Sequence, residues 1–463
     1  MSESKQLPNN IGAYQPGPLP EAPRPMAPFP AQSAEYPTYM PLQAVTIGSE
    51  LKQEGSERQA QLFKPITIRG VTWPNRMWVA PMCMYSSDDG KATDFHLVHH
   101  GSMALRGWGN LMIEATGVVP EGRISPQDMG IWSDEHIAPL KRVVDFVHAQ
   151  GAKIGIQLAH AGRKASTNAP WVQRLATENG WKGGEVAPSS VGGWPENVTG
   201  PSAIPYDDAN PDPREASVAY IQSIVEAFGA ATERCKKIGF DYIEIHGAHG
   251  YWNHNFCDPL SNHRTDAYGG SFEKRTRMSL EVVAEVRRRW SGPLLYRISA
   301  TDWLEYTGPE KLETPKGEEE WAYWGIEQTT LLAAKLRDAG VDLLDVSSGG
   351  NDGRGRIDVR PGYQVPYAEH VKKNVPGLLV GAVGLITDSE QAETILATGQ
   401  ADVVLFGREV LRGVDFPLDA AVKLGVAAAP AVQYERAWGR MLKHVPAVSA
   451  VPPVKPLDEQ KEQ

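Results

Sequence analysis

The chain has 463 residues, of which 41% are hydrophobic and 22% are charged, a globular balance that is ample for a large core. Its formal net charge of -10 argues against a nucleic-acid or anionic-membrane partner, because phosphate binding needs clustered Lys and Arg. No apolar run reaches the length of a membrane span, and the first residues lack the pattern of a signal peptide. The three cysteines show no CxxC spacing, so we expect a reducing, cytoplasmic location.

Proline-rich sequence occupies the N-terminal part of the chain. The stretch PGPLPEAPRPMAPFPAQ cannot hold a helix and offers few groups for a core. We interpret residues 1–60 as a flexible or surface-wrapping arm, residues 61–440 as one barrel domain, and residues 441–463 as a loose tail.

Short β-rich runs alternate with helical patterns through the rest of the chain. Most of the runs are continuously apolar, as in strands that are covered on both faces. They span residues 77–81, 110–118, 152–158, 241–246, 293–299, 341–347, 377–383 and 401–407. Two of the helical patterns end at a glycine, and a third, SFEKRTRMSLEVVAEVRRRW, opens on Ser271 as an expected N-cap.

Eight strands that are nearly all followed by helices predict a (β/α)8 TIM barrel. The alternative is a doubly wound sheet, which would concentrate its site at one or two switch points. The barrel is favoured because unusual residues stand at the C-terminal ends of many strands, where barrel active sites are built. These residues are Cys83, Ala115, Gln157, His246, Arg297, Ser347, Gly381, Gly384, Gly407 and Arg408.

The last two strands end in GAVGLIT and FGRE, which indicates a phosphate site. Glycines at Gly381, Gly384 and Gly407 would leave backbone amides exposed, and late barrel strands are the usual seat of a phosphate. Arg408 would add a planar, permanently charged group. The alternative is two tight turns where only glycine fits, with Arg408 in solvent.

Three further strand-end residues need partners. Gln157 suits a ligand carbonyl with an adjacent ring N–H, or else an internal backbone hydrogen bond. Arg297 needs an anion, either a ligand or a nearby acid such as Asp302. The Cys83 side chain either fills space as a small packing residue or belongs to the active site.

The stretch HGAHGYWNHNF begins at His246, directly after an apolar run. His246 and His249 could form an ordinary turn, or bind a metal with His254 and Asp258 as further ligands. They could also hold a carbonyl or enolate oxygen while Tyr251 delivers a proton. The barrel context favours this third interpretation.

From about Leu62 to Trp438 the sequence resembles the old yellow enzymes, closest to the bacterial thermophilic-like branch and its fungal relatives. The longest carrying segment is HGAHGYWNHNFCDPLSNHRTDAYGGSFEKR; others are APMCMYSS, GIQLAHAGRKA, DVSSGG, GAVGLIT, FGRE and QYERAW. The resemblance implies a (β/α)8 barrel that binds FMN and takes electrons from NADPH, with NADH possible. Long loops after the third and fifth strands and the proline-rich extension depart from the compact members.

The resemblance also implies a role for each matching position. His246 and His249 would bind the carbonyl oxygen of an α,β-unsaturated substrate, and Tyr251 would protonate its α-carbon. Tyr85 would lie beside the substrate, and Arg436 would reach the site of a neighbouring subunit in a dimer or tetramer of dimers. The implied FMN contacts are Pro81, Met82, Cys83, Ala115, Gln157, Arg297, Ser347, Gly381, Gly384, Gly407 and Arg408.

The implied activity is an ene reductase, in which hydride passes from the nicotinamide to FMN and then to the β-carbon of an activated alkene. The resemblance implies no metal, nucleic acid or membrane partner. Two other readings of the residues stay open: a metal-dependent lyase or hydrolase on the same barrel, and a non-catalytic flavin-binding protein.

Overall fold

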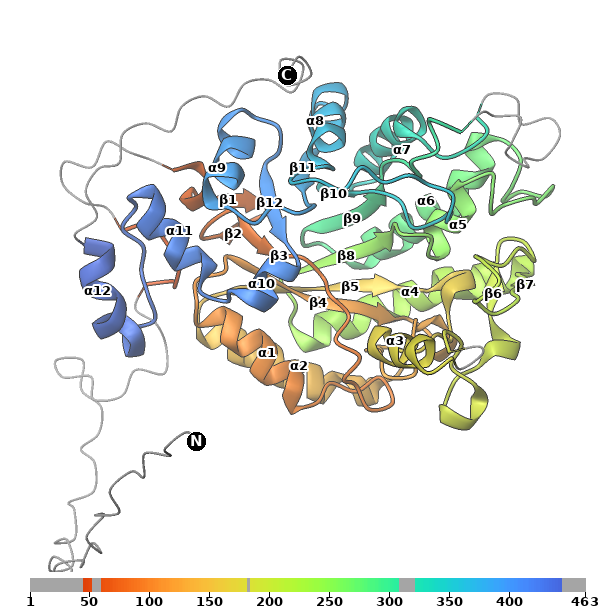
Figure 1. The fold of residues 1–463 in the computed structure, drawn as a ribbon, viewed down its shortest axis with the longest axis horizontal. Coiled ribbons are helices and arrows are strands. Elements are labelled where there is room, and N and C mark those ends of the chain that lie inside the picture. The colour runs from red at the N-terminus through yellow and green to blue at the C-terminus, as the bar shows by residue number, and fades with distance from the viewer. Residues whose placement is uncertain (1–44, 52–59, 181–183, 308–320, 444–463) are drawn as a thin grey trace, which may run out of the picture. The chain divides into compact units, whose positions relative to one another are not determined.

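A computed structural model describes residues 45–51, 60–180, 184–307 and 321–443. Its centre is a closed barrel of eight parallel strands in the order β10-β11-β12-β3-β4-β5-β8-β9 (Figure 1). The strands are β3 (Met77–Val79), β4 (Asn110–Gly117), β5 (Lys153–Ala159), β8 (Tyr242–Gly247), β9 (Leu294–Ser299), β10 (Leu343–Ser347), β11 (Leu379–Ala382) and β12 (Val403–Phe406). The TIM-barrel prediction is confirmed, and each strand lies within a residue or two of its predicted run.

Helices cover the outside of the barrel, as Figure 1 shows. They are α1 (Asp94–Ala104), α2 (Ile137–Ala149), α4 (Val218–Ile238), α6 (Phe272–Arg289), α7 (Ile326–Asp338), α8 (Val365–Asn374), α9 (Ser389–Ala397) and α11 (Phe416–Leu424). The helix α4 begins where the Ser217 side chain accepts a hydrogen bond from the Tyr220 N–H, and ends at Gly239, whose φ is 94°. These are the cap residues that a helix of this sequence prefers.

Four further helices lie on the loops or after α11. They are α3 (Pro170–Glu178), α5 (Trp252–Cys257), α10 (Arg408–Arg412) and α12 (Glu435–Lys443). None of the helices in the described ranges combines the length and apolarity that a bilayer crossing needs.

One part of the proposed N-terminal arm is described. Ile47 is buried, and the Gly48 and Leu51 N–H groups donate to the carbonyls of Ala429 and Ala427. Residues 45–51 therefore pack along the segment that follows α11. Residues 1–44, 52–59 and 444–463 lie outside the described residues, so their assignment as arm and tail stays a prediction.

A hairpin that the sequence reading missed fills the N-terminal end of the barrel. Its strands are β1 (Ile66–Ile68) and β2 (Val71–Trp73). A separate two-stranded sheet outside the barrel consists of β6 (Thr199–Gly200) and β7 (Arg214–Glu215). Trp73 packs on Trp78, with ring centres 4.9 Å apart, and on Tyr242. All three rings are fully buried, so this end of the barrel interior is closed by side chains.

Inward-facing side chains alternate along each strand with outward-facing ones. On β8 the inward series is Tyr242, Glu244 and His246. An ideal Cβ on Gly155 of β5 would stand 2.3 Å from the Tyr242 ring. That ring cannot easily move, because its hydroxyl donates to the Leu111 carbonyl at 2.9 Å.

Gly155→Ala is therefore expected to lower the free energy of unfolding by about 1–3 kcal/mol through overpacking. Gly353→Ala is the matched control, since a Cβ there meets nothing within 4 Å and φ is not positive; its change should stay within about 0.5 kcal/mol. Chemical denaturation of both variants measures the difference. Equal stabilities would contradict the packing argument.

Candidate active site

The pair of histidines and the tyrosine lie together at the end of β8 and on the loop that follows it. His246 is the penultimate residue of the strand, His249 has a left-handed φ of 59°, and Tyr251 is the N-cap residue of α5. The His246 ring centre lies 5.3 Å from that of His249 and 5.0 Å from that of Tyr251, both edge-to-face. The strained turn at His249 brings three rings that could share one ligand into contact.

Burial makes both imidazoles neutral. Desolvation, followed by the positive charge of Arg297, holds the pKa values of His246 and His249 well below the ordinary value. The Nδ1 of His246 accepts the Ala248 N–H at 3.3 Å, so its proton is on Nε2, which is a hydrogen-bond donor. Desolvation also raises the pKa of Tyr251 well above its usual range, so its phenol keeps its proton.

A hydrogen-bonded chain holds His249 in place. Its Nε2 lies 2.7 Å from the Ser347 Oγ, and its backbone N–H donates to the Ser299 Oγ at 2.9 Å. Ser347 in turn donates to the Oε1 of Gln364 at 3.3 Å, and the Gln364 Nε2 donates to the Val383 carbonyl. The chain runs from the β8 loop to the end of β11 and fixes the imidazole relative to three strands.

A buried polar layer lies on the barrel side of the histidines. The Gln157 Nε2 donates to the Glu244 carboxylate at 2.8 Å. The Arg297 Nε lies 3.0 Å from the Asp345 carboxylate. The partner suggested for Arg297, Asp302, is wrong: register places Asp345 of β10 opposite Arg297 of β9, and Asp302 follows that strand.

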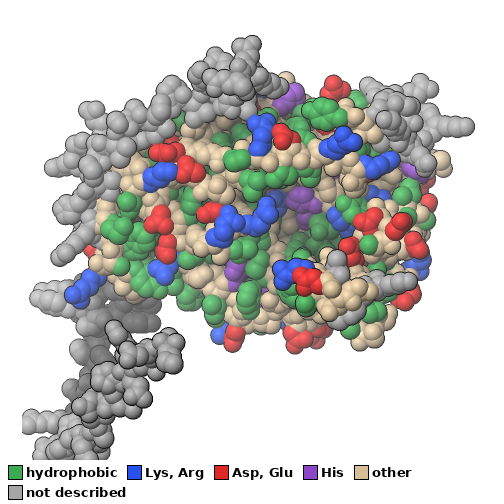
Figure 2. Space-filling model, viewed as in Figure 1, with side chains coloured by type: hydrophobic (Ala, Val, Ile, Leu, Met, Phe, Trp, Pro, Cys, Tyr) green, Lys and Arg blue, Asp and Glu red, His purple; other side chains and the backbone are tan. Residues whose placement is uncertain are grey.

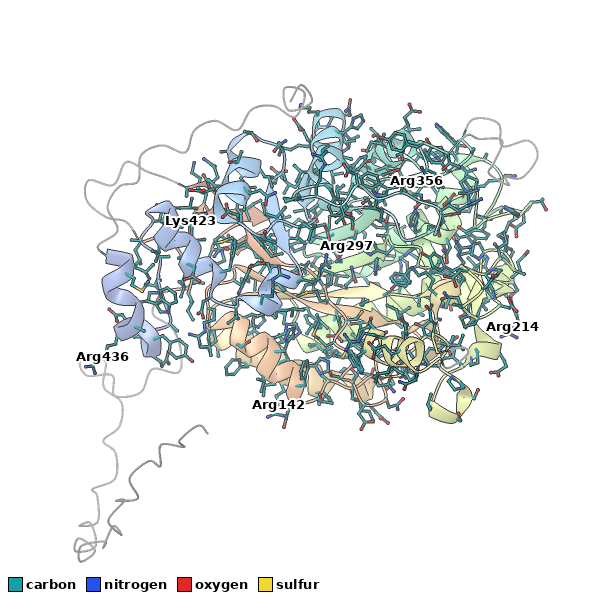
Figure 3. All side chains as sticks on the ribbon, in the orientation of Figure 1. Arg142, Arg214, Arg297, Arg356, Lys423 and Arg436 are labelled. Carbon is teal, nitrogen blue, oxygen red and sulfur yellow. The ribbon has the colours of Figure 1, made fainter. Side chains whose placement is uncertain are left out.

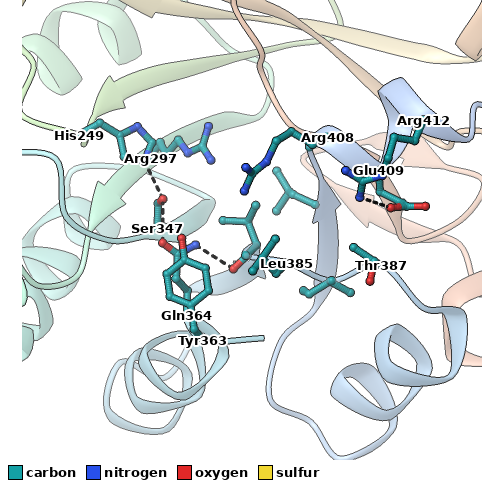
Figure 4. A pocket seen from close by; sticks show the side chains of 15 residues that line it. His249, Arg297, Ser347, Tyr363, Gln364, Leu385, Thr387, Arg408, Glu409 and Arg412 are labelled. Carbon is teal, nitrogen blue, oxygen red and sulfur yellow. Dashed lines mark hydrogen bonds and ion pairs between the residues drawn. The ribbon is translucent and has the colours of Figure 1, made fainter. Parts of the chain in front are cut away.

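A pocket of about 220 Å³ opens beside this layer. Its lining includes His249, Arg297, Ser347, Gly384, Gly407 and Arg408 among the predicted site residues. Figure 4 shows the guanidinium groups of Arg297 and Arg408 pointing into the same space from two sides. In Figure 2 a hollow near the middle of the view has histidine and basic side chains at its edge.

The glycines around the pocket differ in what they permit. Gly384 has a φ of 123° and a Cβ there would stand 2.8 Å from the Gln364 Nε2, so its turn requires glycine. A Cβ on Gly407 would meet only the Met82 Sδ, at 3.9 Å, and would project into open space. Gly381 is buried in β11, where a Cβ would stand 2.6 Å from Leu405; it does not line the pocket.

These observations test whether the pocket fits the phosphate of a flavin nucleotide. The open space at Gly407 lies beside Arg408, which forms no ion pair with any residue in the described ranges. A phosphate would find both space and an unpaired guanidinium group there, so these residues fit it. Arg297, which is paired with Asp345, lines the same pocket. The helix α10 that follows is too short to add a separate site.

The loop after β3 carries Pro81, Met82, Cys83 and Tyr85, all half-buried. Desolvation, with help from the charges of Asp128 and Glu114, raises the pKa of the Cys83 thiol well above its usual range, so the thiol is not ionised. Tyr85 has a φ of 50°, and its ring packs edge-to-face on Trp171 of α3 at 5.4 Å. Ala115 is buried on β4, next to the irregular register at Glu114.

Arg436 is exposed on α12. Figure 3 shows it at the far left of the view, well apart from Arg297. It does not reach the pocket of its own chain.

A buried cluster of possible metal ligands lies behind the β8 loop. Among the described residues, the one group of three such side chains is His254, Asp258 and Asp302. It includes neither His246 nor His249, as the metal interpretation of that pair would need. The positive charges of Arg163 and Lys164 already act on the cluster.

The sequence reading missed Lys164, Glu244 and Gln364. Glu244 stands two residues before His246, so the period of a strand places it on the same face. Lys164 ends the stretch LAHAGRK, directly after Gln157 and its strand. No pattern marked Gln364.

Comparisons with known proteins show the family to which the chain is similar. The profile of the family described as NADH:flavin oxidoreductase / NADH oxidase matches residues 61–425. An NADH:flavin oxidoreductase of Gibberella zeae is 47% identical over 384 residues, 82% of this chain and 87% of that protein. An NADPH dehydrogenase of Geobacillus thermodenitrificans is 44% identical over 379 residues, 81% of this chain and 98% of that one.

Solved structures of the same fold include morphinone reductase. It superposes with a TM-score of 0.61 at 25% identity, over 85% of this chain and 98% of that chain.

Proposed function

The chain belongs to the NADH:flavin oxidoreductase / NADH oxidase family and is an FMN-dependent NAD(P)H oxidoreductase of the old yellow enzyme type, and we propose on this basis that it reduces the C=C bond of α,β-unsaturated carbonyl compounds. The resemblance seen in the sequence, with its FMN cofactor and nicotinamide donor, is thereby confirmed. The observation that carries the finer proposal is the cluster of two neutral imidazoles and one protonated phenol at the barrel mouth.

Each polar group has a distinct task in this reaction. His246 binds the carbonyl oxygen through its Nε2–H and favours the negative charge that develops there. His249 binds the same oxygen through an Nδ1–H when Ser347 donates to its Nε2 and not to Gln364. Tyr251 gives its proton to the α-carbon. When bound, FMN would supply the hydride for the β-carbon, and the nicotinamide would reduce FMN again.

The residues around the pocket would hold the cofactor. Gly384, Gly407 and Arg408 would take its phosphate, and Arg297 would lie near the ring edge that carries negative charge in the reduced state. Pro81, Met82, Cys83, Ala115 and Gln157 would line the ring. NADPH in preference to NADH is part of the proposal, and so is an activated alkene as the substrate.

The role proposed for Arg436 depends on the assembly of subunits into an oligomer. Because it lies away from its own pocket, we expect it to complete the site of a second subunit, in a dimer or a tetramer of dimers. Light scattering of the purified protein measures the assembly, and a monomer would contradict this role.

A spectroscopic experiment tests the function. The purified protein is expected to be yellow, to bleach on anaerobic addition of NADPH, and to regain its colour with cyclohexenone. Cyclohexanone, which has no C=C bond, is the matched control and should leave it bleached. A colourless preparation that FMN cannot reconstitute, or a bleached one that the enone does not reoxidise, would contradict the proposal.

A further inference from the structure

Lys164 lies against the proposed proton donor, although no role follows for it from the reaction as described. It ends the short 3-10 helix Gly162–Lys164 after β5. Its Nζ donates to the carbonyl of His249 at 3.0 Å and to that of Gly350 at 2.9 Å. These two bonds join the loop after β8 to the loop after β10 and fix the ammonium group at the site.

The same Nζ lies over two aromatic rings. It is 5.2 Å from the centre of the Tyr251 ring and 4.4 Å from that of Tyr206. An ammonium group within about 6 Å of a ring centre is attracted by the negative face of the ring. The attraction increases greatly if the ring belongs to a phenolate, because the anion spreads its charge over the ring.

We propose that Lys164 is a positioning residue that acts through Tyr251, by stabilising the phenolate that remains once the phenol has given its proton to the substrate. The inference rests on the proposed function. In this step the O–H bond of Tyr251 breaks and a C–H bond forms at the α-carbon. The oxygen keeps the electron pair of the broken bond, and a proton from water later restores the phenol.

The electrostatic surroundings of Lys164 favour such a role. Burial first, and then the charge of Arg163, lower the pKa of Lys164 to about 8, against the opposing pull of Asp207 and Asp302. The group is therefore charged at neutral pH and poised to lose that charge in mildly alkaline solution. The other titratable groups that interact with it are His246, His249, His254, Tyr206 and Tyr251.

The sign of the pH effect follows from the charge. Below pH about 8 the ammonium stabilises the phenolate; above it the neutral amine does not, so alkene reduction slows as the pH rises through this value. The pKa values of both histidines lie far below this window and that of Tyr251 far above it. Burial raises the pKa of Asp128, which also acts on Tyr251, to about 7, so its effect is a separate, lower step.

Three variants separate charge from structure. Lys164→Met removes the charge, Lys164→Arg keeps it at every pH, and Lys141→Met alters an exposed lysine of α2 as the matched control. Stopped-flow measurement of the holoenzyme is expected to show alkene reduction about 10- to 30-fold slower in Lys164→Met, without the step near pH 8. Lys164→Arg should recover the rate and also lack that step, while flavin reduction by NADPH stays unchanged in all three.

A second readout needs neither cofactor nor alkene. A fluorinated tyrosine placed at position 251 reports its own pKa by 19F NMR, because fluorine makes the phenol more acidic. That pKa is expected to be about one unit higher with Met at position 164 than with Arg, which keeps its charge at the pH where the phenol titrates, and unchanged in Lys141→Met. If wild-type enzyme fails to reduce enones, the proposed function is wrong, and this titration still decides the role of Lys164.

Three outcomes would overturn the inference. One is an equal pKa of residue 251 in Lys164→Met and Lys164→Arg. The others are a step near pH 8 that persists in Lys164→Met, and a loss of rate that Lys164→Arg does not recover, either of which would assign Lys164 only to holding the loops together.

Discussion

Replacing Tyr251 with phenylalanine is expected to slow alkene reduction by about 10²- to 10⁴-fold, the usual contribution of a positioned proton donor. The change removes one oxygen and leaves the ring, so the edge-to-face contact with His246 at 5.0 Å is kept. Flavin reduction by NADPH needs no proton from this phenol and should be nearly unchanged. Stopped-flow spectroscopy measures the two half-reactions separately.

The ratio of the two half-reactions is what tests the role of Tyr251. An equal loss in both would mean that the substitution disturbs the site as a whole. An unchanged rate of alkene reduction would mean that water, or another residue, protonates the substrate. For substrates with a more strongly activated double bond the rate of alkene reduction should fall less, because their carbanion is more stable and depends less on protonation by Tyr251.

Replacing His246 with phenylalanine is expected to lower the rate of alkene reduction by about 10²- to 10³-fold, the cost of removing one donor from an oxyanion site. His246→Asn, which keeps an N–H donor, is the matched variant and should recover part of the loss. Binding of a phenol to the oxidised enzyme, followed by its visible spectrum, gives the affinity for an oxygen ligand directly. Equal behaviour of the two variants would contradict hydrogen bonding as the role of His246.

The pH profile adds a condition to this second prediction. Desolvation and Arg297 hold the pKa values of both histidines well below the ordinary value, so the donors are neutral N–H groups near pH 7. We therefore expect that His246 causes no step in the rate of alkene reduction near pH 6.5. A step that is present in the wild type and absent in His246→Asn would indicate a protonated imidazole at the site.

Much of the fold could be predicted because strands and helices alternate with clear boundaries. Runs such as DYIEIH and LLYRIS are apolar, short and bounded, and each is a barrel strand. The hairpin of β1 and β2 escaped because its strands have three residues each. Its turn, Arg69–Gly70, has φ values of 44° and 80°, and glycine after a polar residue between alternating runs is the signal that could have found it.

The site was predictable to the level of strand ends, and no further, from pattern alone. His246, Arg297 and Ser347 stand where a barrel places its chemistry. The choice between Asp302 and Asp345 as the partner of Arg297 depends on the register between β9 and β10, which no single strand encodes. Lys164 binds backbone carbonyls and ring faces, and neither kind of partner is visible in a sequence.

The aromatic cluster of Trp73, Trp78 and Tyr242 has a consequence for how ligands enter and leave the barrel. Because one end of the barrel interior is filled, ligands reach the site from the opposite end, and under the proposed function the nicotinamide and the alkene would share that entrance. Each reactant would then bind only after the previous one has dissociated, and a high concentration of either would inhibit binding of the other.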